Sequence, residues 1–239
     1  MNKYIIHLEA KKQMPIKIIR EKKEKQLPPK QRKTAVVVIG RFQPPTKGHA
    51  KIVDAAKKYW RKNKLDAVFL FIIEGKETSK DKLKNPLSGN ERRRYIKNST
   101  FSVGVKVEIA ASAFDAFAKC RELGYEPIAV VGGKFISGDK SENRADAFKG
   151  ILDKYFVDED GQQIEHHAIT VERDEKSETI KGVSATLARA AAIADRYEDF
   201  LEIVSIDNED VAKELFDRLQ SVLKKAKEDK LKKEHDDAV

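Results

Sequence analysis

The sequence predicts an α/β protein built on a doubly wound, parallel, five-stranded sheet. Short apolar runs rich in β-branched residues alternate with segments of helical apolar periodicity. Such alternation is typical of a parallel sheet with helices on both faces, joined by right-handed crossovers. The expected strands are residues 35–39, 67–73, 103–109, 127–131 and 168–172.

Helices are expected between these strands, at residues 47–62, 88–98, 112–123 and 184–196. The second begins with Ser88 and carries Glu91 three residues later, which is the capping-box pattern. The third ends at Gly124, a residue suited to the left-handed conformation that closes a helix. Because the ligands of such sheets bind at the carboxyl ends of the strands, the loops there are the candidate site.

The chain is expected to have three parts. A basic N-terminal arm and linker covers residues 1–34, and the α/β domain covers 35–197, with a polar insertion at about 137–161. A charged helical extension covers residues 198–239, and apolar residues from Leu215 keep a helical stripe in it until about Leu231.

The net charge of +9 is concentrated in the arm. Residues 1–34 hold 11 Lys/Arg and 3 Asp/Glu, a net charge of +8, which leaves +1 for the remainder. The arm is either a solvated leader or a segment that docks an acidic protein surface or nucleic acid. Tyr4 is its one aromatic residue, so a platform for stacking bases is not expected.

Composition excludes several classes of protein. A single cysteine, Cys120, rules out an internal disulfide framework and favours a reducing, cytoplasmic compartment or an intracellular assembly. No apolar run approaches the ~20 residues that a membrane span requires. The N-terminus lacks the apolar core and cleavage site of a signal peptide.

The loop after the first strand has the composition of a phosphate-binding site. Residues 40–49 read Gly-Arg-Phe-Gln-Pro-Pro-Thr-Lys-Gly-His and lead into a helix, where backbone N–H groups and the helix dipole favour an anion. Thr46 and His49 offer hydroxyl and ring N–H donors. Close backbone approach or positive charge comes from Gly40, Arg41, Lys47 and Gly48.

The string Thr46-Lys47-Gly48-His49 resembles the T/HxGH loop of the cytidylyltransferase-like nucleotidyltransferase superfamily. The longer string that begins Gly-Arg-Phe-Gln-Pro is most similar to the nicotinamide-mononucleotide adenylyltransferase branch. Residues 183–189, Val-Ser-Ala-Thr-Leu-Ala-Arg, resemble the second signature, ISxTxxR. Residues 85–92, Asn-Pro-Leu-Ser-Gly-Asn-Glu-Arg, are similar to a segment that shapes the substrate pocket in that branch.

This resemblance implies a Rossmann-like fold and nucleotidyl transfer from a nucleoside triphosphate, favoured as ATP, to a phosphorylated acceptor, favoured as nicotinamide mononucleotide. Pyrophosphate would leave, and Mg²⁺ would be held through the triphosphate, with no metal ligand from the protein. The implied catalytic residues are Thr46, His49 and Arg189. Ser184 and Thr186 would hold the distal phosphates, and Phe42 would line the cleft together with Gly40 and Arg41.

One departure from the family pattern concerns the loop after the fourth strand. Gly132-Gly133-Lys134 stands where the superfamily often has Gly-Ser-Asp and a basic residue, so an acidic contact is missing. The substrate-pocket candidates are Asn85, Arg92, Gly132 and Lys134, although Arg92 with its neighbours is more simply explained as part of a solvated, capped helix.

Two alternatives stay open. The first is a structural or assembly protein on a transferase fold, favoured by the basic arm, the charged C-terminus and the altered loop. The second is a cytidylyltransferase or pantetheine-phosphate adenylyltransferase, disfavoured because Gln43 stands where those proteins have Asp. A homo-oligomer or membership of a larger assembly is expected in either case.

Three further features have ordinary structural explanations. His166 and His167 are adjacent on a predicted strand and point to opposite faces, so a metal site is not expected there. Trp60 lies near the end of an amphipathic helix and is expected to pack. Cys120 is expected in the core.

Overall fold

The computed structural model describes residues 32–76, 78–137, 140–158, 160–171 and 184–236. The predicted basic arm up to residue 31, and Val183 of the second signature, lie outside these ranges.

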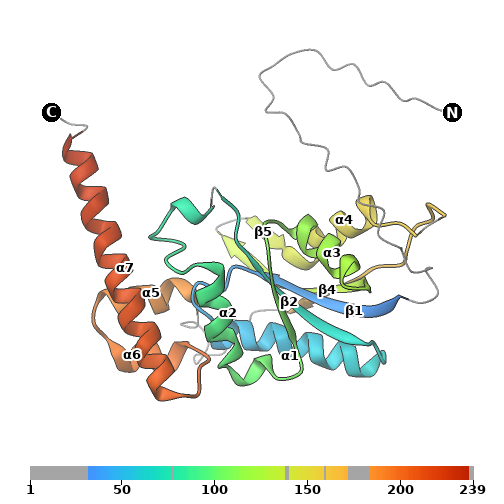
Figure 1. The fold of residues 1–239 in the computed structure, drawn as a ribbon, viewed down its shortest axis with the longest axis horizontal. Helices are drawn as coiled ribbons and strands as arrows, with labels where there is room; N and C mark the ends of the chain where they lie inside the picture. Colours follow the sequence, from blue (N-terminus) through green and yellow to red (C-terminus); the bar gives the residue numbers. More distant parts are fainter. Residues whose placement is uncertain (1–31, 77, 138–139, 159, 172–183, 237–239) are drawn as a thin grey trace, which may run out of the picture.

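The predicted doubly wound parallel sheet is confirmed, and its five parallel strands in the described ranges run in the order β3-β2-β1-β4-β6 (Figure 1). From β1 the chain winds first toward β3 and then returns to form β4 and β6 on the other side. The carboxyl ends of β1 and β4 therefore flank the topological switch, where a ligand crevice is expected. The strands are β1 (Lys33–Gly40), β2 (Ala67–Ile73), β3 (Lys106–Ala110), β4 (Tyr125–Ser137), β5 (Lys140–Asn143) and β6 (His167–Val171).

The helices lie where the apolar periodicity predicts them, except that the C-terminal extension contains two helices. The helix expected from Ser184 to about Arg196 is present but ends at Ile193, before the chain turns at Asp195, whose φ is +58°. The capping box of Ser88 and Glu91 is present, with the Ser88 amide 2.8 Å from a Glu91 carboxylate oxygen. The helices are α1 (Lys47–Lys62), α2 (Gly89–Lys97), α3 (Ala113–Glu122), α4 (Arg144–Tyr155), α5 (Ala185–Ile193), α6 (Tyr197–Ile203) and α7 (Glu209–Asp236).

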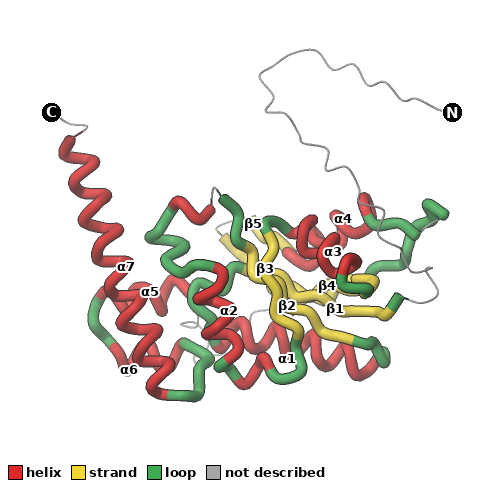
Figure 2. The backbone as a smooth tube through the Cα atoms, in the orientation of Figure 1, coloured by secondary structure: helices red, strands yellow, loops and turns green. Residues whose placement is uncertain are grey.

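Two strands differ from their expected extents. The third begins at Lys106 and not at Val103, because the chain first turns through Gly104, whose φ is +74°. The fourth continues to Ser137 and pairs antiparallel with β5, so the polar insertion begins as a hairpin on the parallel sheet (Figure 2).

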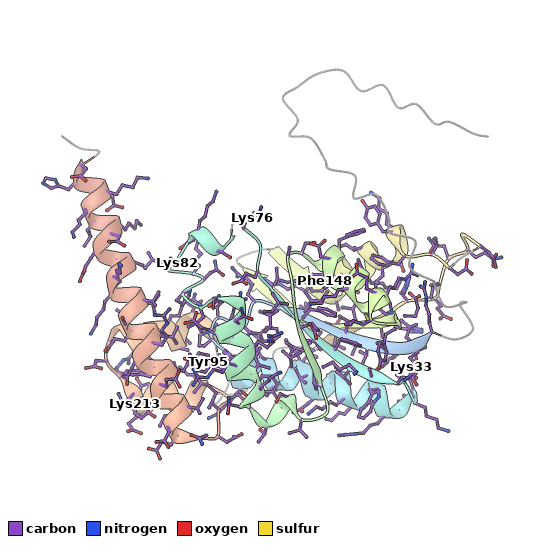
Figure 3. All side chains as sticks on the ribbon, in the orientation of Figure 1. Lys33, Lys76, Lys82, Tyr95, Phe148 and Lys213 are labelled. Carbon is purple, nitrogen blue, oxygen red and sulfur yellow. The ribbon has the colours of Figure 1, made fainter. Side chains whose placement is uncertain are left out.

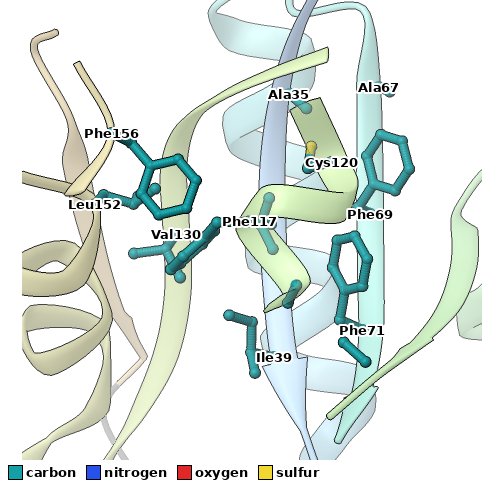
Figure 4. Packing of buried hydrophobic residues seen from close by; sticks show 13 residues of the cluster. Ala35, Ile39, Ala67, Phe69, Phe71, Phe117, Cys120, Val130, Leu152 and Phe156 are labelled. Atoms are coloured by element: carbon teal, nitrogen blue, oxygen red, sulfur yellow. The ribbon is translucent and has the colours of Figure 1, made fainter. Parts of the chain in front are cut away.

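Both faces of the sheet are covered by helices. On one face, Phe117 of α3 and Leu152 of α4 belong to one core cluster with Phe71 of β2 and Val130 of β4 (Figure 4). Cys120 belongs to this cluster and is fully buried, as expected, and burial raises the pKa of its thiol. On the other face, α1 contributes Val53 and Ala56, and α2 contributes Ile96, to a second cluster. Trp60 packs against that cluster, as expected of a helix-end aromatic residue.

The C-terminal extension shares a third core with the signature helices. Leu215, Leu219 and Leu223 of α7 are fully buried against Ala188 of α5 and Tyr95 of α2. The far half of α7 continues beyond the body of the molecule (Figure 2). The predicted apolar stripe thus docks α7 beside the carboxyl edge of the sheet. None of the helices in the described part of the chain has the length and apolar character needed to cross a membrane.

Candidate functional site

The loop between β1 and α1 forms the centre of the candidate site. Thr46 is the N-cap of α1 and is 2% exposed, and its amide donates to Nδ1 of His49 over 3.0 Å. Thr46 Oγ1 lies 2.9 Å from the same nitrogen. The main chain of Thr46 also forms an antiparallel bridge with Val204, just after α6. The C-terminal part of the chain therefore braces this loop.

This contact fixes the tautomer of His49. A backbone amide can only donate, so Nδ1 must accept, and the proton of the neutral ring lies on Nε2. A ring held in this way presents an N–H donor of defined direction at a helix N-terminus, which suits an oxyanion of a phosphate.

Phe42 and Gly40 support the loop from beneath. Phe42 is 2% exposed, belongs to the core cluster under α1, and lies with its ring 4.7 Å from that of His49. A Cβ on Gly40 would come within 2.9 Å of the Phe42 ring, so glycine allows this packing. Phe42 thus contacts the site through His49 and does not line an open cleft, a difference from its expected place. Lys47 is exposed and Gly48 half-buried in the first turn of α1.

The second signature reaches the same loop. Nη1 of Arg189 donates to the main-chain carbonyl of Gln43 over 2.6 Å, and Nη2 lies 3.2 Å from Thr186 Oγ1. Ser184 caps α5 by accepting from the Leu187 amide over 3.2 Å. The structure therefore brings together the two segments that the sequence places at opposite ends of the domain.

The electrostatics of this junction favour an anion. Burial lowers the pKa of Arg189, and the nearby positive charge of Arg41 lowers it further, against a weaker opposing effect of Asp81. Arg41 also lowers the pKa of Arg92, for which burial is again the largest cause. The charge of the exposed Arg41 thus adds to the unfavourable burial of the charged Arg189 and Arg92 side chains. The negative charge of a bound phosphate would stabilise all three.

Arg92 lies under the site. It is 2% exposed, and Nη1 donates to the carbonyls of Arg41 and Ile73 over 2.7 and 2.8 Å. Nη2 pairs with Glu74 at 3.3 Å, and Nε donates to the Ser88 carbonyl over 3.2 Å. Arg92 therefore joins the ends of β1 and β2 to the start of α2. Its role is explained by neither of the two sequence interpretations, a direct substrate contact or a solvated helix.

The other substrate-pocket candidates lie on two different segments of the chain. Asn85 is 7% exposed and lies in the segment before α2. Gly132 faces the start of α4, where an added Cβ would lie 2.7 Å from the Ala145 amide nitrogen. Lys134 is partly exposed where β4 begins to pair with β5. Gly132 therefore serves helix packing at this edge, and its neighbour Lys134 stays a predicted contact.

Two residues of this network were missed by sequence reasoning. The Gln43 side chain is 4% exposed and bonds both backbone groups of Leu87. The Glu74 carboxylate accepts from the Gly89 amide at the N-terminus of α2 and pairs with Arg92. Glu74 directly follows the buried strand β2, which marks it as a residue at this edge of the sheet, but no such signal marks the partners of Glu74 and Gln43.

Comparison with known protein families identifies the part of the chain that contains both signature segments. The sequence model of the family described as cytidylyltransferase-like matches residues 37–191, more than half of the chain. The chain belongs to this family. The match spans both signature segments of the cytidylyltransferase-like domain, and nucleotidyl transfer in general is the activity that this membership supports.

No protein among the curated sequences matches the chain. Among solved structures, the chain is similar to a crystal structure titled macrolide-efflux protein from Streptococcus pneumoniae. The two are 21% identical, with a TM-score of 0.46, over 72% of this chain and 55% of that one. The chain thus spans about half of that protein, and a likeness of this degree carries no functional argument.

Proposed function

We propose that this cytidylyltransferase-like protein transfers the adenylyl group of ATP to the phosphate of a small acceptor, with nicotinamide mononucleotide as the favoured acceptor. The observation that carries the proposal is the 2.6 Å hydrogen bond from Arg189 to the Gln43 carbonyl, which joins the two signature segments. This bond brings Arg189 and its neighbour Thr186 to the loop that carries His49, at the carboxyl edge of the sheet.

The reaction needs positioning and charge stabilisation more than covalent help from the protein. An oxygen of the acceptor phosphate forms a bond to the α-phosphorus as the α–β bridging bond breaks, and the electron pair leaves with pyrophosphate. His49 donates its Nε2 proton in a hydrogen bond to an α-phosphate oxygen, with its direction set by Thr46. Arg189, Ser184 and Thr186 hold the β- and γ-phosphates.

Mg²⁺ fits this donor set as an ion carried by the triphosphate. The groups at the loop are hydroxyl, imidazole and guanidinium, which bind phosphate oxygens, and the described residues hold no group of three metal-ligating side chains. The ion would neutralise charge on the phosphates. The protein's part is to orient the oxygens that share it.

Pyrophosphate release by the purified protein tests the proposal. ATP and CTP are each offered with nicotinamide mononucleotide, pantetheine phosphate and other phosphorylated acceptors in the presence of Mg²⁺. We expect release with ATP and one acceptor, and a 10²–10³-fold loss of rate in His49→Ala, the scale for one preorganised donor. Release with CTP and not with ATP would show that the donor nucleotide is CTP. No pyrophosphate release from a folded protein that still binds ATP would favour the alternative, a structural or assembly protein.

A further inference from the structure

The Gln43 side chain makes a two-way contact with the segment before α2. Its Nε2 donates to the Leu87 carbonyl over 2.6 Å, and its Oε1 accepts from the Leu87 amide over 3.0 Å. Both residues are buried, with Gln43 4% and Leu87 2% exposed. The Leu87 backbone offers one acceptor and one donor, so the orientation of the Gln43 amide follows from its partners.

A second link runs the opposite way, from α2 back to the same loop. The Arg92 side chain donates to the Arg41 carbonyl over 2.7 Å, so each segment holds main-chain groups of the other. The main-chain carbonyl of Gln43 meanwhile receives Arg189. Gln43 therefore joins its own loop to residues 85–88 through its side chain and to α5 through its main-chain carbonyl.

We propose that Gln43 is a positioning residue that sets the separation between the phosphate loop and the acceptor side of the site, residues 85–88. The inference rests on the proposed function, because it takes these residues as the acceptor side. Few side chains can replace an amide here. A methionine of similar length makes neither bond, and an ionised glutamate accepts from the Leu87 amide but cannot donate to the Leu87 carbonyl.

The expected effect follows from the precision that transfer requires. Loss of the contact leaves two buried main-chain groups without partners and frees residues 85–88 to shift. Misplacement by about 1 Å costs on the order of 10²-fold in rate. The nucleotide loop is also held by Thr46, Val204 and Arg189, so its affinity for ATP should change much less.

The test compares Gln43→Met with Gln220→Met. Gln220 is the matched control because its side chain bonds the Ala192 carbonyl and Asp195 on the C-terminal side of the molecule. In Gln43→Met we expect kcat/KM for the acceptor to fall about 10–100-fold, with the Kd of ATP changed less than about threefold. Gln220→Met should keep its kinetics even if its melting temperature falls equally. Equal kinetic losses in the two variants, or none in Gln43→Met, would overturn the proposal.

Gln43→Glu adds a readout that a purely structural role would not move. Protonation of the new carboxyl restores a donor toward the Leu87 carbonyl, so its activity relative to the natural protein should rise as the pH falls. No such rise is expected for Gln43→Met. A flat ratio across pH for Gln43→Glu would count against the two-way contact.

Hydrogen exchange separates this inference from the proposed function. Backbone exchange of residues 85–92 should accelerate at least about tenfold in Gln43→Met and stay unchanged in Gln220→Met. This readout needs no turnover, so it is decisive even if the natural protein shows no transfer. Unchanged exchange would overturn the positioning role, whereas accelerated exchange in an inactive protein would remove only the proposed activity.

Discussion

Tyr95 of α2 donates its hydroxyl to the carboxylate of Glu214 on α7 over 3.1 Å, across 119 residues of sequence. Tyr95 lies on the helix next to α7 (Figure 3). The Tyr95 ring is buried, and burial together with the Glu214 charge raises its pKa to about 12. Arg94 pairs with the same carboxylate, but both partners are largely exposed. Glu214 therefore joins α7 to the helix that begins beside the site.

We expect Tyr95→Phe to lower the free energy of unfolding by about 1 kcal/mol, because it removes one half-buried hydrogen bond. Arg94→Ala should lower the free energy of unfolding less than Tyr95→Phe does, since exposed ion pairs are screened by solvent and salt. Urea denaturation measures both. The order of the two effects is what matters, and a larger loss in Arg94→Ala would contradict this account.

Two glycines give a matched pair for packing against α4. Gly132→Ala should destabilise the protein by about 1–3 kcal/mol, because its Cβ would lie 2.7 Å from the Ala145 amide nitrogen, and backbone must move. Gly150, inside α4, has nothing within 4 Å of an added Cβ, so Gly150→Ala should stabilise by about 0.5–1 kcal/mol. Thermal melts compare them, and equal melting temperatures would refute the packing argument.

Stability should fall at mildly acidic pH because of His166. Its side chain is fully buried, with Nδ1 3.0 Å from Asp153, and burial lowers its pKa despite the opposing charges of Asp153 and Glu126. The unfolded chain takes up the proton near pH 6.5, before the folded protein does. The contribution is therefore complete above that pH and is lost as the pH falls toward the folded-state pKa.

Unfolding free energies at pH 7 and 5 provide the measurement. His166→Gln should flatten this part of the pH dependence, whereas the exposed His167→Gln should leave it as it is. The carboxylates with lowered pKa, among them Asp153, lose their contribution to stability only as the pH falls below their ordinary pKa values. These values lie below pH 5, the lower of the two measured conditions. A pH dependence that survives in His166→Gln would assign the effect elsewhere.

Arg189→Lys should weaken ATP binding about tenfold, or roughly 1.4 kcal/mol, under the proposed function. Arg189 bonds Gln43 and Thr186 with two separate nitrogens, and a lysine ammonium cannot reproduce that fork. Calorimetric titration with Mg²⁺ and ATP gives the affinity. Arg196→Lys, which alters an exposed pair with Asp199, is the control. Equal affinities of the two variants for ATP would exclude a role for the Arg189 guanidinium in phosphate binding.

Much of the fold was predictable because it depends on local patterns. The apolar runs gave the five parallel strands, and Ser88 with Glu91 gave the start of α2. The hairpin of β4 with β5 was not predictable, since its polar sequence lacks strand periodicity. The division of the C-terminal extension into α6 and α7 was not predicted, because the whole extension has a helical composition.

The site was predictable only in part. The loop and Arg189 were found by their motifs, and the structure brings them into contact. The roles of Gln43 and Glu74 arise from tertiary contacts with backbone groups of Leu87 and Gly89, which no local pattern encodes. Arg92 was read as a ligand contact or a surface residue because nothing in a charged helix marks which arginine is buried.

The bridge between Thr46 and Val204 also bears on how the protein is made. Translation releases the β1–α1 loop early, but its brace emerges only after every strand of the described sheet, and the α7 residues that complete the third core follow still later. A nascent chain can therefore build most of its sheet while the loop has no final shape. A chain that ended before Val204 would therefore hold every strand of the described sheet and still lack the contact that braces the β1–α1 loop.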